Sequence, residues 1–218
     1  MIKNLFKVIL PVAALSLTAC NNNKQQELDF IQENLEFAEA QTKLMLDKVG
    51  EPNGKNYPRT MNDKGNLVVT SMYDWTPGFF PGSLWYLYEL SNDKFWLDKA
   101  EEWTHSLEKL KHFTGHHDLG FMMYCSYGNA MRLAPKAEYD SILITSAASL
   151  ASRYSPITET IKSWNYRKAW NDTVEWFYPV IIDNMMNLEL LTQGSKLAKN
   201  DVYKNVAITH ANTTLKNQ

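Results

Sequence analysis

The chain has 218 residues, a formal net charge of −2 and 12% aromatic residues. This length is enough for one domain with a sizeable core, or for part of a larger domain. The balanced charge argues against a surface of clustered lysine and arginine, so the sequence predicts no nucleic-acid binding. The many aromatic side chains suit a packed core, and they would equally suit a site that stacks sugar rings.

The first 20 residues have the pattern of an export signal. Lys3 and Lys7 precede or flank a mainly apolar stretch that is too short to span a bilayer stably. It ends in small residues directly before Cys20, which resembles a bacterial lipoprotein signal cleaved before the lipid-carrying cysteine. We expect a signal peptide at 1–20, a polar tether at 21–27 and a domain at 28–218. A plain secretory signal, or an anchor with an incidental cysteine, is the alternative.

This interpretation places the mature protein at the bacterial cell envelope, either periplasmic or associated with the outer membrane. The N-terminal lipid would be its sole contact with a membrane. Cys125 would then be the one remaining cysteine, so the sequence predicts neither an intramolecular disulfide nor a cysteine-rich metal site.

The chain after the tether reads mainly as helices. Ile31, Leu35, Ala38, Met45 and Val49 follow helical spacing. Residues 53–66 are rich in turn formers and predict a loop, and residues 67–73 suit a short extended piece. Pro81 suits the first turn of an apolar helix, and Asn92 and Asp93 suit the cap of the next one.

Nearly all-apolar segments then alternate with amphipathic ones. The segments expected to be helical are 94–112, 120–134, 137–154, 180–195 and 198–218. Such alternation is typical of stacked helix pairs with an inner and an outer ring. The sequence therefore predicts an all-α fold, and it shows no exact internal repeat.

Two aspartates lie in apolar surroundings. Asp118 stands between two histidines and Leu119, and Asp183 interrupts the run VIIDNMMNLELL. A carboxylate in such a place is costly unless it is paired or functional, and burial raises its pKa. Two carboxylates facing one cavity are what glycoside chemistry requires. The alternative is that each aspartate caps or bridges helices.

Aromatic residues cluster in a loop before one predicted helix. Trp75, Phe79 and Phe80 are separated by glycine and proline, so flat rings could line the mouth of a helical ring. Trp164 is a further candidate for the wall of such a site. The alternative for the loop is a hydrophobic staple that closes the helix end.

Metal and serine chemistry have weak support. His112 and His116 are four residues apart and His117 is adjacent, but they fall in a loop and no glutamate completes an HExxH pattern. No G-x-S-x-G motif is present for a nucleophilic serine. The sequence therefore predicts neither a metal nor an organic cofactor.

Five segments together resemble a known enzyme family. In chain order they are SMYDWTPGFFPGSLWYLYEL, GHHDLGFM, IKSW, YPVIIDNMMNLELL and AITHANTTLKN. They are similar to the unsaturated glucuronyl hydrolases of glycoside hydrolase family 88. The resemblance implies an (α/α)6 toroid of helical hairpins, with Asp183 as general acid/base and Asp118 as the second essential carboxylate. It also implies a sugar subsite lined by His117, Trp75, Phe79 and Trp164.

The implied reaction removes a 4,5-unsaturated glucuronyl residue from the non-reducing end of oligosaccharides that polysaccharide lyases leave behind, of the glycosaminoglycan type. Asp183 would protonate C4 of the vinyl ether and help water attack C5. The alternatives are an unsaturated rhamnogalacturonyl hydrolase, a non-catalytic glycan-binding lipoprotein, and a structural helical-repeat protein.

The family also extends well beyond the last segment matched here. Residues 28–218 would supply about half of the toroid. Half a ring leaves the apolar faces of inner helices exposed and opens the cavity to water, which weakens the pKa tuning of Asp183. We therefore expect a truncated chain in which the site residues are present and activity is impaired.

Overall fold

The computed structural model describes the backbone of residues 2–171 and 173–217, with side chains described from residue 25 onward. The chain divides into two compact units, residues 1–47 and 48–218. Helix α1 (Ile2–Val49) accounts for the first unit and runs through the predicted signal and tether. The side chain of Cys20 lies outside the described ones, so its lipidation stays a prediction. Within the described part of the chain, no helix is both long enough and apolar enough to cross a membrane.

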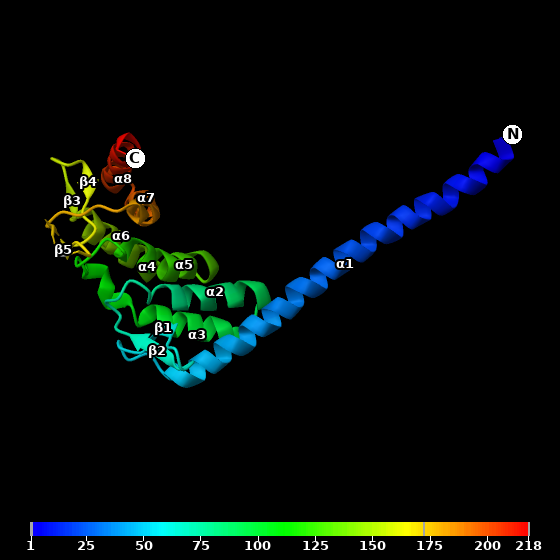
Figure 1. The fold of residues 1–218 in the computed structure, drawn as a ribbon, viewed down its shortest axis with the longest axis horizontal. Helices are drawn as coiled ribbons and strands as arrows, with labels where there is room; N and C mark the ends of the chain where they lie inside the picture. Colours follow the sequence, from blue (N-terminus) through cyan, green and yellow to red (C-terminus); the bar gives the residue numbers. More distant parts are fainter. Residues whose placement is uncertain (1, 172, 218) are drawn as a thin grey trace. The chain divides into compact units, whose positions relative to one another are not determined.

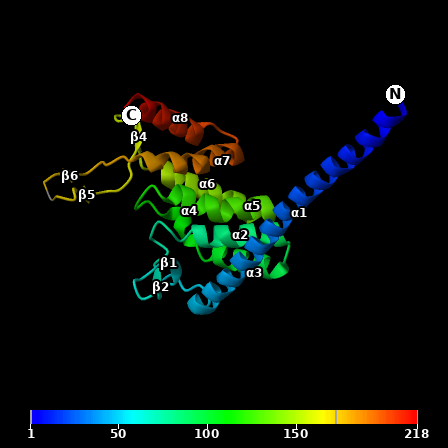
Figure 2. The same cartoon turned by 45° about the vertical axis from the view of Figure 1, so that its right-hand side comes forward.

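The second unit is built from layers of helices (Figure 1). Figure 2 shows the layers running from α3 and α2, through α4, α5 and α6, to α7 and α8. The bounds of these helices are α2 (Phe79–Ser91), α3 (Lys94–His105), α4 (Leu119–Met123), α5 (Asn129–Leu133), α6 (Ala137–Ala151), α7 (Leu188–Ala198) and α8 (Val202–Lys216). The close pairs α2–α3, α6–α7 and α7–α8 are each formed by consecutive helices, as in stacked hairpins, although strands β3 to β6 come between α6 and α7. The all-α prediction is confirmed.

Short irregular helices connect the layers. A 3₁₀ turn, η1 (Glu108–His112), follows α3, and a π turn, η2 (Tyr124–Gly128), joins α4 to α5. A second 3₁₀ turn, η3 (Ile182–Asn187), precedes α7. The uniform helices expected at 94–112, 120–134 and 180–195 are therefore each interrupted, so these three predictions were wrong in detail.

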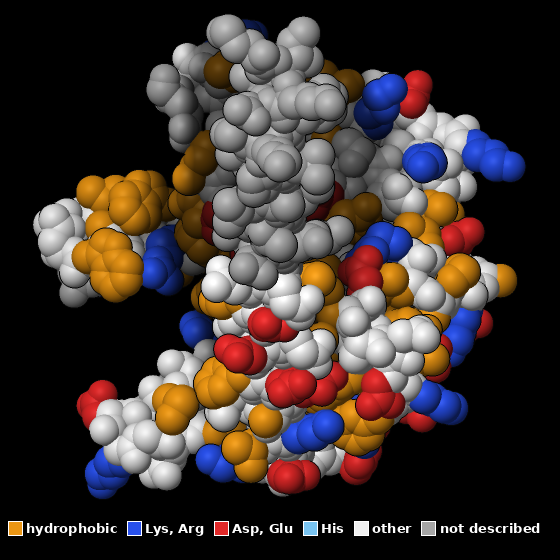
Figure 3. Space-filling view, turned by 90° about the vertical axis from the view of Figure 1, so that its right-hand side faces the viewer, with side chains coloured by type: hydrophobic (Ala, Val, Ile, Leu, Met, Phe, Trp, Pro, Cys, Tyr) orange, Lys and Arg blue, Asp and Glu red, His pale blue; other side chains and the backbone are white. Residues whose placement is uncertain are grey.

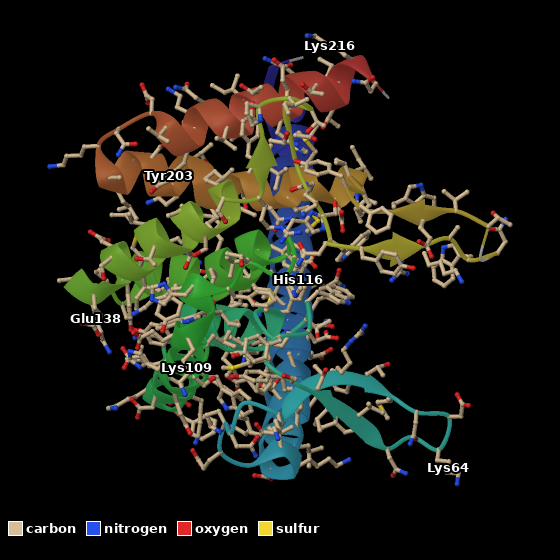
Figure 4. The ribbon with its side chains drawn as sticks, turned by 90° about the vertical axis from the view of Figure 1, so that its left-hand side faces the viewer. Lys64, Lys109, His116, Glu138, Tyr203 and Lys216 are labelled. Atoms are coloured by element: carbon tan, nitrogen blue, oxygen red, sulfur yellow. The ribbon has the colours of Figure 1, made fainter. Side chains whose placement is uncertain are left out.

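Among the residues that the structure describes, three small antiparallel hairpins complete the unit. They are β1 (Tyr57–Met61) with β2 (Leu67–Thr70), β3 (Tyr154–Ser155) with β4 (Thr160–Ile161), and β5 (Arg167–Lys168) with β6 (Glu175–Trp176). The extended piece expected near residue 67 corresponds to β2, whereas β1 and the two later hairpins were missed. Figures 2 and 4 show the β1–β2 and β5–β6 hairpins projecting from the same end of the helix layers.

Tryptophans fill the core between α2 and α3. Trp85, Trp96 and Trp103 are fully buried, and the indole N–H of Trp85 donates to Thr104 Oγ1 over 2.9 Å. Phe80 packs its ring edge-on against Trp103, with the ring centroids 4.7 Å apart. This burial of large rings accounts for much of the aromatic content and supplies a large share of the hydrophobic stabilisation.

Local sequence signals set the ends of α2 and α3. Asn92 ends α2 in the left-handed region with φ 54°, and the Asp93 carboxylate accepts a hydrogen bond from the backbone N–H of Phe95. The predicted cap is thus confirmed. At the other end of α2, a Cβ at Gly78 would lie 2.3 Å from the carbonyl oxygen of Met122. The absence of a side chain there lets the aromatic loop approach α4.

Candidate active site

The two aspartates predicted to carry the chemistry lie on either side of one buried histidine. His117 Nε2 lies 3.3 Å from Asp118 Oδ1 and 3.6 Å from Asp183 Oδ1. Asp118 immediately precedes α4, and Asp183 lies in the first turn of η3. Residues 65 positions apart in the sequence are therefore brought into one cluster, which we call the carboxylate cluster: His117, Asp118 and Asp183.

Two asparagines hold η3 in place. Asn187 Oδ1 accepts the backbone N–H of Phe121 over 2.9 Å, and Asn184 Nδ2 donates to the carbonyl of Ile161 over 2.6 Å. In a 3₁₀ turn, residues i and i+3 share a face, so both asparagines point into the protein. Both are fully buried. Their hydrogen bonds give a physical reason why η3 departs from the α-helix expected there.

Gly120 allows the close approach between α4 and η3. A Cβ at this position would lie 2.4 Å from both Cβ and Oδ1 of Asn187. A glycine two residues after Asp118 thus lets the turn that carries Asp183 pack directly against the start of α4. The spacing of the two carboxylates depends on this contact.

A second set of contacts ties Asp118 to the neighbouring loops. His116 Nδ1 lies 2.9 Å from Asp118 Oδ2, and His116 Nε2 lies 3.0 Å from the carbonyl oxygen of Tyr73. The backbone N–H of His117 donates to the carbonyl of Ser163, and His116 forms an isolated antiparallel bridge with Trp164. Figure 4 shows His116 at the end of the helix layers from which the hairpins project.

Burial shifts the pKa values of Asp183 and His117 in opposite directions. Burial raises the pKa of Asp183; nearby His117 offsets part of this shift, and the charge of Asp118 adds to it. Burial lowers the pKa of His117, against the pull of the two carboxylates, which favours a neutral imidazole. A carboxyl group with a raised pKa is suited to donate a proton near neutral pH.

One oxygen of the Asp183 side chain is buried, and the rest of the side chain is partly exposed to solvent. Its Oδ1 atom is buried without a hydrogen-bond partner among the described residues, whereas the side chain as a whole is 41% exposed. One oxygen therefore faces His117 while the rest of the side chain can meet a ligand from solvent. Buried oxygens without a partner are uncommon in folded proteins, and a catalytic role is one of the reasons for which they occur.

The aromatic residues expected to line a sugar subsite pack against Phe121, three residues after Asp118, or against His117. Trp75 is 45% exposed and its ring centroid lies 6.3 Å from that of Phe121. Phe79 stacks on Phe121 at 5.3 Å, and Trp164 meets the His117 ring edge-on at 5.7 Å. Phe80 belongs to the core instead. The assigned roles of Trp75, Phe79 and Trp164 stay predictions; Trp164 contacts the cluster at His117, whereas Trp75 and Phe79 contact Phe121.

The residues considered for a metal do not assemble as a histidine site. Among the described residues, the one group of three potential ligands is the carboxylate cluster itself, with its ligand atoms within 4.8 Å of one another. His112 and His116 are not part of it. By distance alone the cluster could hold a cation, but the oxygen-rich, charge-coupled arrangement equally suits proton transfer.

Several buried polar residues near the cluster were not predicted from the sequence. His210, on α8, is fully buried and accepts the backbone N–H of Ile161 at Nδ1 over 3.1 Å. Burial lowers the pKa of His210. His210 and Asn184 together satisfy the backbone N–H and the backbone carbonyl of Ile161. The signal was present in the sequence, because asparagines three apart in an apolar run are costly to bury unless they are bonded.

Comparison with known proteins identifies relatives of the chain and tests its fold. No protein-family model matches the chain. It is 38% identical over 222 residues to the unsaturated glucuronyl hydrolase of Formosa agariphila, covering 97% of this chain and 54% of that protein. It is 28% identical over 185 residues to the unsaturated chondroitin disaccharide hydrolase of Streptococcus pyogenes serotype M1, covering 83% of this chain and 44% of that protein.

Among solved structures, an unsaturated glucuronyl hydrolase specific for heparin superposes with a TM-score of 0.77 at 40% sequence identity. The match covers 87% of this chain and 48% of that one. The chain spans about half the length of the curated relatives it matches. The predicted toroid of helical hairpins is confirmed for this part of the fold.

Proposed function

This chain belongs to the family of unsaturated glucuronyl hydrolases, and on that premise we propose that it carries the acid/base half of such an enzyme. The substrate would be an oligosaccharide whose non-reducing end is a 4,5-unsaturated glucuronyl residue, as lyases leave on glycosaminoglycan-type polymers. Relatives described as acting on chondroitin disaccharides or as specific for heparin support this substrate class.

One observation carries the proposal: two carboxylates from separate elements reach the same buried imidazole nitrogen, at 3.3 and 3.6 Å. One of them, Asp183, has its pKa raised by burial and remains partly open to solvent. A proton donor and a second carboxylate therefore face one small volume. That is the arrangement which protonation of an electron-rich double bond needs.

In the proposed reaction, the Asp183 carboxyl group donates its proton to C4 of the vinyl ether, and positive charge develops at C5. Water then forms a bond to C5 and returns a proton to the Asp183 carboxylate, so the catalyst is regenerated. The resulting hemiketal opens by breaking the bond from C5 to the ring oxygen, which gives a ketone at C5 and a hemiacetal at C1. The hemiacetal then breaks the bond from C1 to the glycosidic oxygen; C1 becomes an aldehyde, and the neighbouring sugar leaves with the hemiacetal proton on its oxygen. General acid–base help of this kind is typically worth ~10²–10⁴-fold.

The other cluster members have supporting roles in this scheme. Asp118 holds negative charge near C5, and it raises the pKa of Asp183 further. His117 keeps the two carboxylates apart while remaining neutral. Trp75, Phe79 and Trp164 present flat rings against which the unsaturated sugar stacks. No step uses a metal or an organic cofactor.

The location at the cell envelope is also part of the proposal. The pattern before Cys20 supports a signal peptide at 1–20 and a lipid on that cysteine, with residues 21–27 as a tether to the domain that follows. Metabolic labelling with a fatty-acid analogue would test this. Label that persists in a Cys20→Ala variant would refute it, and label that is lost would support it.

The decisive test of the function follows the loss of ultraviolet absorbance of the unsaturated uronate in lyase-made disaccharides. We expect turnover that disappears in Asp183→Asn and persists in Asp140→Asn, a matched change on the exposed face of α6. Since the chain spans about half of its relatives, the assay is run with and without the complementary half of a relative. Absence of turnover under both conditions would refute the proposal.

A further inference from the structure

A cavity of about 460 Å3 lies beside the carboxylate cluster. Its walls include Trp164, Arg167, Trp170, Trp176, Tyr178 and Ile181. This volume falls within the range of small-molecule sites, and a largely apolar wall with four aromatic rings and one cation is typical of sites that hold a polar ring compound. The proposed mechanism does not use this cavity.

The cavity shares walls with the site of the proposed reaction. Trp164 lines the cavity, and its ring also meets that of His117 at 5.7 Å. Ile181 lines it too and stands two residues before Asp183. A ligand that spans from Asp183 past Trp164 would therefore place its next sugar in the cavity.

The guanidinium group of Arg167 is positioned where it could bind an anion. Its guanidinium carbon lies 5.5 Å from the ring centroid of Trp164 and 5.2 Å from that of Trp170. Among the described residues no carboxylate pairs with it. Glu175, on the facing strand, instead accepts a hydrogen bond from the Tyr166 hydroxyl over 3.2 Å. Stacking on two rings orients the guanidinium plane while leaving its N–H groups free.

The other projecting hairpin offers an internal comparison. Arg59, on β1, lies 5.0 Å over the Trp75 ring, but it is also paired with Asp74 at 3.2 Å. Its charge is therefore balanced by a neighbouring carboxylate, whereas no carboxylate of the described residues balances that of Arg167. In Figure 3 the β5–β6 hairpin forms a projecting lobe with large hydrophobic side chains beside basic ones. The two hairpins thus differ in what they can bind.

We propose that this cavity is a subsite for the sugar next to the unsaturated residue, and that Arg167 binds an anionic substituent on that sugar, a sulfate or a carboxylate. The planar guanidinium fork matches such groups with two parallel hydrogen bonds. The tryptophans supply stacking faces for the ring that bears the anion. This inference rests on the proposed function for the position of the ligand, and it adds a preference among substrates.

Binding measurements in the full chain test the inference. The Asp183→Asn background removes turnover, and the probes are two lyase-made unsaturated disaccharides of one skeleton, with and without 6-O-sulfate on the saturated sugar. Isothermal titration calorimetry should give a Kd about tenfold lower for the sulfated probe, as expected of one charge-assisted bond at a partly exposed site. Arg167→Gln should bring the two Kd values within about twofold, and raising the salt should do the same.

A matched control removes one positive charge elsewhere. Lys64 stands at the turn of the β1–β2 hairpin, away from the cavity (Figure 4). Lys64→Gln should keep the tenfold preference, which separates a specific site from general attraction of anions. A preference that persists in Arg167→Gln, or that is absent from the background chain, would overturn the inference.

The outcomes also separate this inference from the proposed function. If the unmodified chain, alone and with the complementary half of a relative, consumes neither probe but binds the sulfated one tightly through Arg167, the function fails and the subsite stands. If it consumes both probes at equal efficiency and Arg167→Gln changes nothing, the function stands and the subsite fails.

Discussion

Replacing Gly120 with alanine should separate the two carboxylates. The new Cβ would lie 2.4 Å from the side chain of Asn187 and 2.6 Å from its Cα, distances that real contacts do not reach. Because the obstacle includes backbone, η3 must move as a unit away from α4. The hydrogen bond from the Phe121 N–H to Asn187, now 2.9 Å, would then lengthen or break.

Three effects set the size of the change. Overpacking of a tight contact costs ~1–3 kcal/mol. A buried N–H left without its acceptor costs ~1–3 kcal/mol. The alanine gains ~0.5–1 kcal/mol in helix propensity over glycine. The net destabilisation should be about 3 kcal/mol, and the melting temperature of a chain this size should fall by about 6–12 °C.

Thermal unfolding followed by circular dichroism measures this loss, and the absorbance assay measures turnover in parallel. Gly82→Ala is the matched control, since its nearest neighbour would be the Cys125 carbonyl at 3.1 Å and a small shift relieves the contact. It should change stability by less than about 1 kcal/mol. A Gly120→Ala protein that melts at the original temperature and keeps its activity would refute the view that this contact sets the spacing of the carboxylates.

Three further outcomes are expected. The pKa of Asp183 is raised in the folded protein, so its ionised form lowers the stability of the fold above that pKa. Asp183→Asn should therefore raise the melting temperature by about 1–2 °C at neutral pH, and it should have no such effect below the carboxyl pKa of the unfolded chain. Equal melting temperatures of the two proteins at neutral pH would contradict this. Turnover should fall as pH rises through the pKa of Asp183, since the protonated form is the donor, and a rate that climbs there instead would point to a different acid. Burial raises the pKa of Cys125 to about 11, so iodoacetamide should label the native thiol slowly and the denatured thiol rapidly, as mass spectrometry would report; fast native labelling would show that the thiol is accessible.

The fold was largely predictable because local residue patterns indicate where its helices lie. The cap at Asp93 and the apolar spacing of the segment that became α2 gave both the position and the type of these elements. The interruptions at η2 and η3 were not predictable in this way. The turn at η3 is held by hydrogen bonds to distant residues, such as that from Phe121 to Asn187, which leave no mark on local periodicity.

The charged residues of the site were predictable from the sequence. Asp118 and Asp183 stood out because carboxylates are expensive among apolar side chains, and the structure brings both to His117. The residues that position them, including Asn184 and His210, were missed. Neutral polar side chains in a helical segment indicate a functional role less clearly than charged ones do. Both residues bond to the backbone of Ile161, and the identity of that residue does not predict these bonds.

The buried hydrogen bond between His210 and Ile161 has a consequence for how the chain folds. It joins positions 49 apart, and the bond between Asn187 and Phe121 joins positions 66 apart. Contacts between neighbouring helices such as α2 and α3 close short loops, so they are entropically cheap and can form early. The geometry of the carboxylates instead depends on long-range closures. During refolding, amide protection should therefore appear in α2 and α3 before it appears at Ile161 and Phe121, and catalytic competence should be the slowest property to return.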